Sequence, residues 1–184
     1  LGKLTVTENA VAVTLTAPSA SKTYDGTALT KTDGVTATGL PAGFTVEATA
    51  SGSQTDAGSS ANVVDDGYVI KDAEGNDKTA NFTNVTYVPG TLTVNPKAVT
   101  ITTGAASKPY DGTALTEGTA TIGGLADGES VKLTATGSQT EVGSSNNTYS
   151  ITWDNADANN YTVTENLGKL TVTENAVAVT LTAP

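Results

Sequence analysis

The sequence predicts an all-β protein made of two tandem β-rich domains. Apolar residues alternate with Thr and other polar residues along several short runs, which is the period of a strand with one buried face. Turn-forming Gly, Asn and Asp residues separate these runs, and no amphipathic helical run of ten residues occurs. The sequence also repeats itself at two scales, which predicts tandem domains.

The larger repeat is an identity between the first and last eighteen residues. Residues 1–18 and 167–184 both read LGKLTVTENAVAVTLTAP, so the two copies begin 166 residues apart. Identity of this length indicates recent duplication within a longer array. We therefore expect residues 1–9 to be the closing strand of a preceding repeat and residues 175–184 the opening strand of the next. These terminal strands should be disordered or paired with a neighbouring molecule.

A second, divergent duplication lies inside this period. SKTYDGTALT at 21–30 corresponds to SKPYDGTALT at 107–116, and GSQTDAGSS at 52–60 corresponds to GSQTEVGSS at 137–145. These matches predict two domains, residues 10–94 and 95–174. The first is longer, mainly because of a polar, turn-rich stretch at residues 71–80.

The strands and turns are predicted from local patterns. Residues two apart should share a buried face in four runs, at Val11, Val13 and Leu15, at Val99 and Ile101, at Val131 and Leu133, and at Leu170 and Val172. The two copies of Tyr-Asp-Gly predict tight turns, because Gly accepts positive φ. These structural turn residues are Tyr24, Asp25, Gly26, Tyr110, Asp111 and Gly112. The two tyrosines should anchor the turns to the core; a ligand-binding role is the alternative.

The composition excludes several classes of function. The formal net charge is −10, with 19 acidic residues against nine basic ones, all of them Lys, so no nucleic-acid partner is expected. Cys and His are absent, which removes thiolate nucleophiles, Ser-His-Asp triads and zinc sites. The sequence contains no run of 18 apolar residues, so membrane insertion is not expected. We expect no catalytic residues, no cofactor and no enzymatic activity.

Oxygen-rich loops offer candidate calcium ligands. The candidate ligands are Asp72, Glu74, Asn76 and Asp77, although their spacing matches no EF-hand and a solvated turn is the alternative. The only Trp, Trp153, shares a predicted strand face with Tyr149 and Ile151, so it should pack in the core in preference to binding sugar. Lys132 should be exposed, which argues against an isopeptide crosslink.

These motifs together resemble the tandem repeats called mostly bacterial beta-grasp domains, including those marked by a YDG motif. The resemblance rests on Lys-Thr/Pro-Tyr-Asp-Gly-Thr-Ala-Leu-Thr, on Gly-Ser-Gln-Thr-Asp/Glu-x-Gly, and on the closing Gly-x-Leu-Thr-Val, and it covers nearly the whole chain twice. It implies a β-grasp-like module, with its helix short or absent here, in secreted or cell-wall-attached surface proteins of Gram-positive bacteria. No catalytic residues come with it.

The expected function is therefore that of a structural stalk or spacer repeat in an extracellular, cell-surface adhesin-like protein. Links of about four residues, at 7–10 and 95–98, are too short to act as flexible coils. The domains should thus form an elongated, semi-rigid rod whose partners are the neighbouring repeats. The alternative is an adhesive module that binds host glycoproteins or polysaccharides. A glycan-acting enzyme with a carboxylate pair is a third hypothesis.

Overall fold

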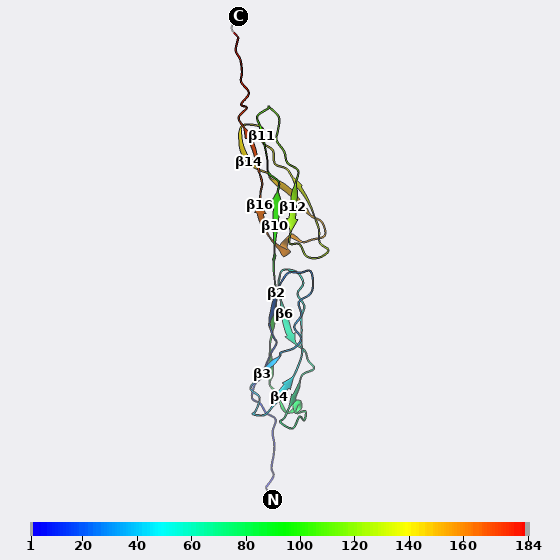
Figure 1. Cartoon of the computed structure of the whole chain (residues 1–184). Coiled ribbons are helices and arrows are strands. Elements are labelled where there is room, and N and C mark those ends of the chain that lie inside the picture. Colours follow the sequence, from blue (N-terminus) through cyan, green and yellow to red (C-terminus); the bar gives the residue numbers. More distant parts are fainter. Residues whose placement is uncertain (1, 183–184) are drawn as a thin grey trace. The chain divides into compact units, whose positions relative to one another are not determined.

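The computed structural model describes residues 2–182 and confirms the all-β prediction (Figure 1). The chain divides into two compact units, and the boundary in the sequence falls between Asn95 and Pro96. The helical residues of the described part are two 3₁₀ turns, η1 (Thr79–Asn81) and η2 (Ala158–Asn160). The helix expected of a full β-grasp is absent from residues 2–182, because the segments between strands are rich in Gly, Ser and Asn, which favour turns.

Unit 1 contains nine strands in three small sheets. The sheet orders are β3-β1-β8, β2-β9-β6-β5 and β4-β7. Their bounds are β1 Val13–Thr16, β2 Ala20–Thr23, β3 Thr36–Thr38, β4 Thr45–Glu47, β5 Ala50–Ser51, β6 Gly58–Val64, β7 Val69–Lys71, β8 Val85–Val88 and β9 Gly90–Asn95.

Unit 2 repeats most of this topology with eight strands. The sheet orders are β12-β10-β16, β11-β17-β14 and β13-β15. Their bounds are β10 Lys97–Thr103, β11 Ala106–Pro109, β12 Ala120–Gly123, β13 Val131–Ala135, β14 Gly143–Asn146, β15 Tyr149–Trp153, β16 Tyr161–Asn166 and β17 Lys169–Thr173.

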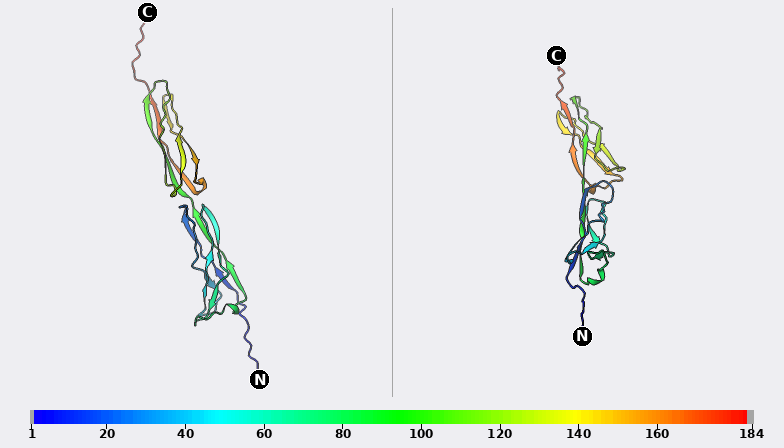
Figure 2. Two further views of the ribbon diagram at one scale, coloured as in Figure 1. Left: turned by 90° about the vertical axis from the view of Figure 1, so that its right-hand side faces the viewer. Right: turned by 60° about the horizontal axis from the view of Figure 1, so that its bottom comes forward.

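The opening and closing segments of each unit run parallel to each other. In unit 1, β1 pairs in parallel with β8, and β2 pairs in parallel with β9. In unit 2, β10 pairs with β16 and β11 with β17 in the same way. Within each unit the two paths lie side by side in both views of Figure 2. Because both paths point in one direction, the chain enters a unit at one end and leaves it at the other.

The opening path of a unit is its first two strands (β1 and β2, or β10 and β11), and the closing path is its last two (β8 and β9, or β16 and β17). Both paths bend midway and pass from one sheet to the next. In unit 1 the bends fall at Pro18 and Pro89, where a missing N–H interrupts the ladder. In unit 2 they fall at Gly104 and Gly168. A Cβ added to Gly168 would lie 2.2 Å from the carbonyl oxygen of Gly104, so the two bends pack backbone against backbone. A Cβ added to Gly90 would lie at the same distance from the carbonyl oxygen of Pro18.

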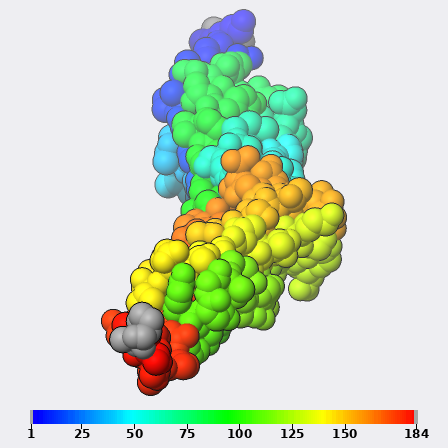
Figure 3. Space-filling model, turned by 90° about the horizontal axis from the view of Figure 1, so that it is seen from above, coloured from blue at the N-terminus to red at the C-terminus, as the bar shows by residue number. Residues whose placement is uncertain are grey.

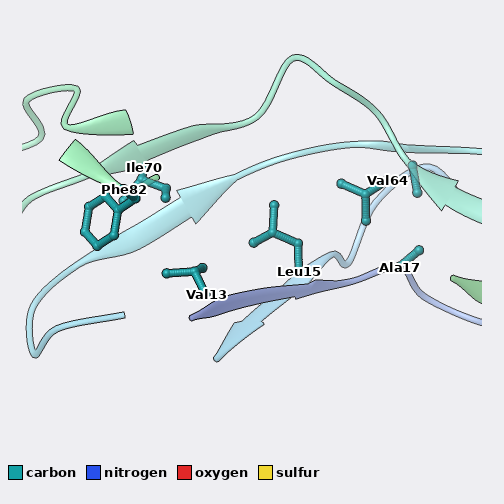
Figure 4. Close-up of a cluster of buried hydrophobic side chains, with 7 residues drawn as sticks. Val13, Leu15, Ala17, Val64, Ile70 and Phe82 are labelled. Atoms are coloured by element: carbon teal, nitrogen blue, oxygen red, sulfur yellow. The ribbon is translucent and has the colours of Figure 1, made fainter. Parts of the chain in front are cut away.

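The core of unit 1 is a small apolar cluster whose residues come from the beginning and the later part of that unit's sequence. Val13, Leu15 and Ile70 are fully buried and pack with Phe82 and Val64 (Figure 4). In unit 2 the fully buried apolar side chains come from the opening and closing strands, namely Val99, Ile101, Leu170 and Val172. Each burial of such a side chain stabilises a unit by about 1.5–3 kcal/mol.

The predicted strand faces are confirmed at most positions and wrong at one. Val13 and Leu15 are buried as the alternation predicts, and Val131 and Leu133 are half-buried. Val11 is 59% exposed, because β1 begins only at Val13 and the backbone bends at Val11, whose N–H donates to Asn9 Oδ1.

The two terminal segments form no strand within the described chain. Residues 2–8 and 174–182 are exposed, with Leu4, Val6 and Leu181 each more than 90% exposed. Asn9 makes a single parallel bridge to Phe82. Pairing of these segments with a neighbouring molecule stays a prediction.

Candidate functional site: the two YDG turns

The YDG turn of unit 1 is organised around one carboxylate oxygen. Asp25 Oδ1 accepts hydrogen bonds from Lys22 Nζ at 2.6 Å, from Thr27 N at 2.9 Å and from Thr27 Oγ1 at 2.7 Å. Lys22 Nζ also donates to the carbonyl oxygen of Thr27 at 2.6 Å. Gly26 takes a φ of 80°, which only Gly adopts without strain. The Lys, Asp and Thr side chains therefore close the turn on itself.

Unit 2 builds the same turn from the equivalent residues. Asp111 Oδ1 accepts from Lys108 Nζ at 2.7 Å, from Thr113 N at 2.9 Å and from Thr113 Oγ1 at 2.8 Å. Gly112 has a φ of 77°. Because two divergent copies keep the same three hydrogen bonds to the Asp carboxylate, the turn is a structural device common to both units.

The tyrosines of the motif attach the turn to the closing strand. Tyr24 is 5% exposed and its N–H donates to the carbonyl of Asn95, while the Tyr110 N–H donates to the carbonyl of Thr173. Tyr110 is half-buried against Leu115, Leu170 and Val172. This packing agrees with the anchoring role predicted for both residues. Sequence reasoning missed Lys22 and Lys108, whose spacing of three residues before Asp in both copies was the available signal.

The hydrogen bonds of the turn hold its carboxyl groups in the charged form. The Lys22 hydrogen bond, followed by those from Thr27, lowers the pKa of Asp25 well below its usual range. Lys108 and Thr113 lower the pKa of Asp111 for the same reason. Both carboxylates are about half exposed, so solvent screens these ion pairs.

Acidification is expected to destabilise both units through these turns. A carboxyl group whose pKa is lowered by folding stabilises the protein above its unfolded pKa of about 4, and that contribution disappears as the pH falls towards the folded value. Urea unfolding measured between pH 7 and pH 2 should show a steeper loss of stability in the native chain than in the Asp25→Asn, Asp111→Asn double variant. The control is Asp154→Asn, an exposed bend residue outside the motif. Equal slopes in the native chain and the double variant would contradict the prediction.

A buried asparagine in each unit connects three separate segments, and sequence reasoning did not single it out. Asn147 is fully buried; its amide nitrogen donates to the carbonyls of Gly104 at 3.0 Å and Glu117 at 2.8 Å, and its Oδ1 accepts from Gly137 N at 3.1 Å. Asn62 likewise donates to the carbonyls of Pro18 and Lys31. The available signal was its place after the paired Gly-Ser-Ser sequences.

Two of the calcium candidates, Asp72 and Asp77, use side-chain oxygens to accept hydrogen bonds from their own loop. Asp72 Oδ1 accepts from the backbone N–H groups of Glu74 and Asn76, and Asp77 Oδ1 accepts from Thr79. Lys78 Nζ lies 3.5 Å from Asp72 Oδ2. In residues 2–182 no group of three or more acidic side chains gathers where it could hold a metal ion.

Trp153 packs inside unit 2. Its ring stacks on that of Tyr161 with centroids 5.5 Å apart and an interplanar angle of 16°. Tyr149, Ile151 and Trp153 are all half-buried along β15, as the alternation predicts, and Lys132 is exposed on β13. The Tyr161 hydroxyl accepts from the N–H of Ala126 and donates to Glu129; burial, followed by this carboxylate, raises its pKa.

The fold and the turns define a class of protein: tandem all-β units, each with a Lys-x-Tyr-Asp-Gly-Thr turn after its second strand. Residues 95–168 match the family model described as the YDG domain. This match confirms the resemblance for unit 2, and the duplicated turn and buried asparagine relate unit 1 to it. No curated protein matches the chain. Among the described residues no helix is long and apolar enough to cross a membrane.

Proposed function

We propose that the chain is a stalk or spacer segment of a larger surface protein, in which successive units extend a distal functional region away from its point of attachment. The observation that carries the proposal is the parallel pairing of opening and closing strands, because each unit then adds its full length between the point where the chain enters and the point where it leaves. The opening path of 13 residues, 97–109, spans about 40 Å at strand rise.

The setting of this stalk is inferred from the YDG resemblance and from the repeat. Secreted or wall-attached proteins of Gram-positive bacteria are the proposed location, and neighbouring repeats of the same chain are the proposed partners. The net charge of −10 argues against a nucleic-acid partner. A role without catalysis is supported by the turn carboxylates, which are paired with Lys and Thr and are therefore poor general acids or bases.

An adhesive role is the second candidate, and edge strands favour it. β8 and β16 are the outer strands of their sheets, with Tyr87, Val88 and Val163 each 40% exposed or more. Such edges can accept an extended peptide by strand addition. A host glycoprotein with an extended segment would be a suitable ligand.

Scattering and binding measurements separate the two candidates. Small-angle scattering of chains with one, two and three 166-residue periods should give a maximum dimension that rises in equal steps, by about 80 Å per period at strand rise. A mucin and glycan array screened with one period should give no saturable signal. A dimension that stays constant as periods are added would contradict the spacer, and saturable binding by a single period would establish the adhesive role.

A further inference from the structure

The end at which a unit's opening strand begins, called its base here, is apolar in unit 1. A groove of 290 Å³ lies there, lined by residues 6–9 and by Pro41, Phe44, Asn81 and Phe82. The Phe44 and Phe82 rings meet edge to face with centroids 5.7 Å apart. Val11, which is 59% exposed, adds apolar surface beside the start of β1.

The base of unit 2 carries polar groups at the corresponding positions. The repeat aligns Phe44 with Glu129, Phe82 with Tyr161 and Val11 with Lys97. The Tyr161 hydroxyl donates to Glu129, and Lys97 Nζ donates to the carbonyl of Leu125 at 3.1 Å. These polar groups find their hydrogen-bond partners within unit 2, so its base needs no covering partner. The base of unit 1 has apolar side chains in their place, and of these Val11 is 59% exposed and Phe44 is half-buried, so a partner that covers them would remove apolar surface from water.

The residues that line the groove identify what covers it. Residues 6–9 are identical to residues 172–175, which close unit 2. There Val172 is 1% exposed in β17 and pairs with Gly143 of β14, whereas Val6 is 98% exposed at the groove. In an array of repeats, the same four residues therefore end one unit 2 and line the groove of the unit 1 that follows it.

That end of unit 2 presents an apolar side chain. Val142 is 51% exposed and immediately precedes β14, whose surface (yellow) lies beside the last described residues (red) in Figure 3. Unit 1 has Ala57 at the equivalent position. Val142 is thus an apolar group suited to a groove lined by Pro41, Phe44 and Phe82.

We propose that the groove of unit 1 docks the exit end of unit 2 from a second copy of this repeat, with Val142 as the central contact. The proposal rests on the tandem array proposed above. A small contact suffices, because a linker of about four residues gives the docking surface an effective concentration in the millimolar range. The joint that leads into unit 1 is then stiffened by apolar packing.

A chain extended by one unit tests this docking. A further copy of residues 96–166 placed before residue 1 gives the order unit 2, unit 1, unit 2, with the native junction sequence. Amide hydrogen exchange at Phe44 and Phe82, whose N–H groups donate to Pro41 and Thr79, should be several-fold slower than in the 184-residue chain. Val142→Asp in the leading copy should remove this slowing.

The matched control is Val142→Asp in the trailing copy, which makes the same change in a unit that precedes no groove. It should leave exchange at Phe44 and Phe82 unchanged. Equal exchange in the extended and the original chain, or equal effects of the two Val142 variants, would overturn the docking. Scattering of the same extended chain distinguishes the two proposals: an added length of one unit without protection at the groove retains the spacer and rejects the docking.

Discussion

Gly168→Ala is expected to be among the most destabilising single substitutions in unit 2. The new Cβ would lie 2.2 Å from the carbonyl oxygen and 2.4 Å from the carbonyl carbon of Gly104, and both atoms are backbone that no rotamer change can move. The bend between β16 and β17 must then separate from the bend between β10 and β11. Gly168 N also donates to Thr103 O and Thr103 Oγ1, both at 3.1 Å, so this shift would weaken both bonds.

The expected loss is about 3 kcal/mol of unfolding free energy, at the upper end of what overpacking costs. Urea unfolding of the full chain, followed by the fluorescence of Trp153, reports on unit 2 because that residue is the only Trp. Gly118→Ala is the control: a Cβ there meets nothing within 4 Å, and no positive φ strains it. A Gly168→Ala chain that unfolds at the native urea concentration would show that the two bends can separate without cost.

Asn147→Leu is expected to have a comparable effect through lost hydrogen bonds. Leu has a similar shape, but it would leave the carbonyls of Gly104 and Glu117 and the N–H of Gly137 without their partner. Each buried group left unpaired costs about 1–3 kcal/mol, so a total loss of about 3 kcal/mol or more is expected.

The neighbouring residue provides a matched control. Asn146 is exposed and contacts Lys169 Nζ at 3.1 Å, so Asn146→Ala should change the unfolding free energy by less than about 0.5 kcal/mol. Both variants are measured by the same Trp153 fluorescence in urea. Equal stabilities of Asn146→Ala and Asn147→Leu would mean that the buried amide contributes nothing to holding the three segments together.

The local features of the fold could be predicted from sequence because they depend on neighbouring residues. Alternation placed Val13, Leu15, Leu170 and Val172 in the core, and Asp-Gly after an extended run placed the turns. The Asn62 contacts could not be predicted in this way. Its partners are backbone carbonyls, which carry no residue-specific signal, and one of them, that of Pro18, lies 44 residues away.

The duplicated eighteen residues separate what sequence determines from what tertiary structure decides. Sequence alone determined the repeat, the alternating pattern Lys-Leu-Thr-Val-Thr and its capacity to form a strand. Yet residues 169–173 form β17 with Leu170 fully buried, whereas the identical residues 3–7 form no strand and leave Leu4 99% exposed. The second half of the eighteen residues, which contains the opening strand of a unit, shows the reverse. Leu15 is buried in β1, whereas its counterpart Leu181 is 92% exposed.

The physical reason is that a strand is stable only when neighbours satisfy its backbone and cover its apolar face. β17 has β11 on one side and β14 on the other, and both belong to the unit that residues 169–173 close. Residues 3–7 have no such neighbours among residues 2–182. The pattern of side chains therefore specifies which face of the strand can be buried, and the presence of its partner strands decides whether the strand forms.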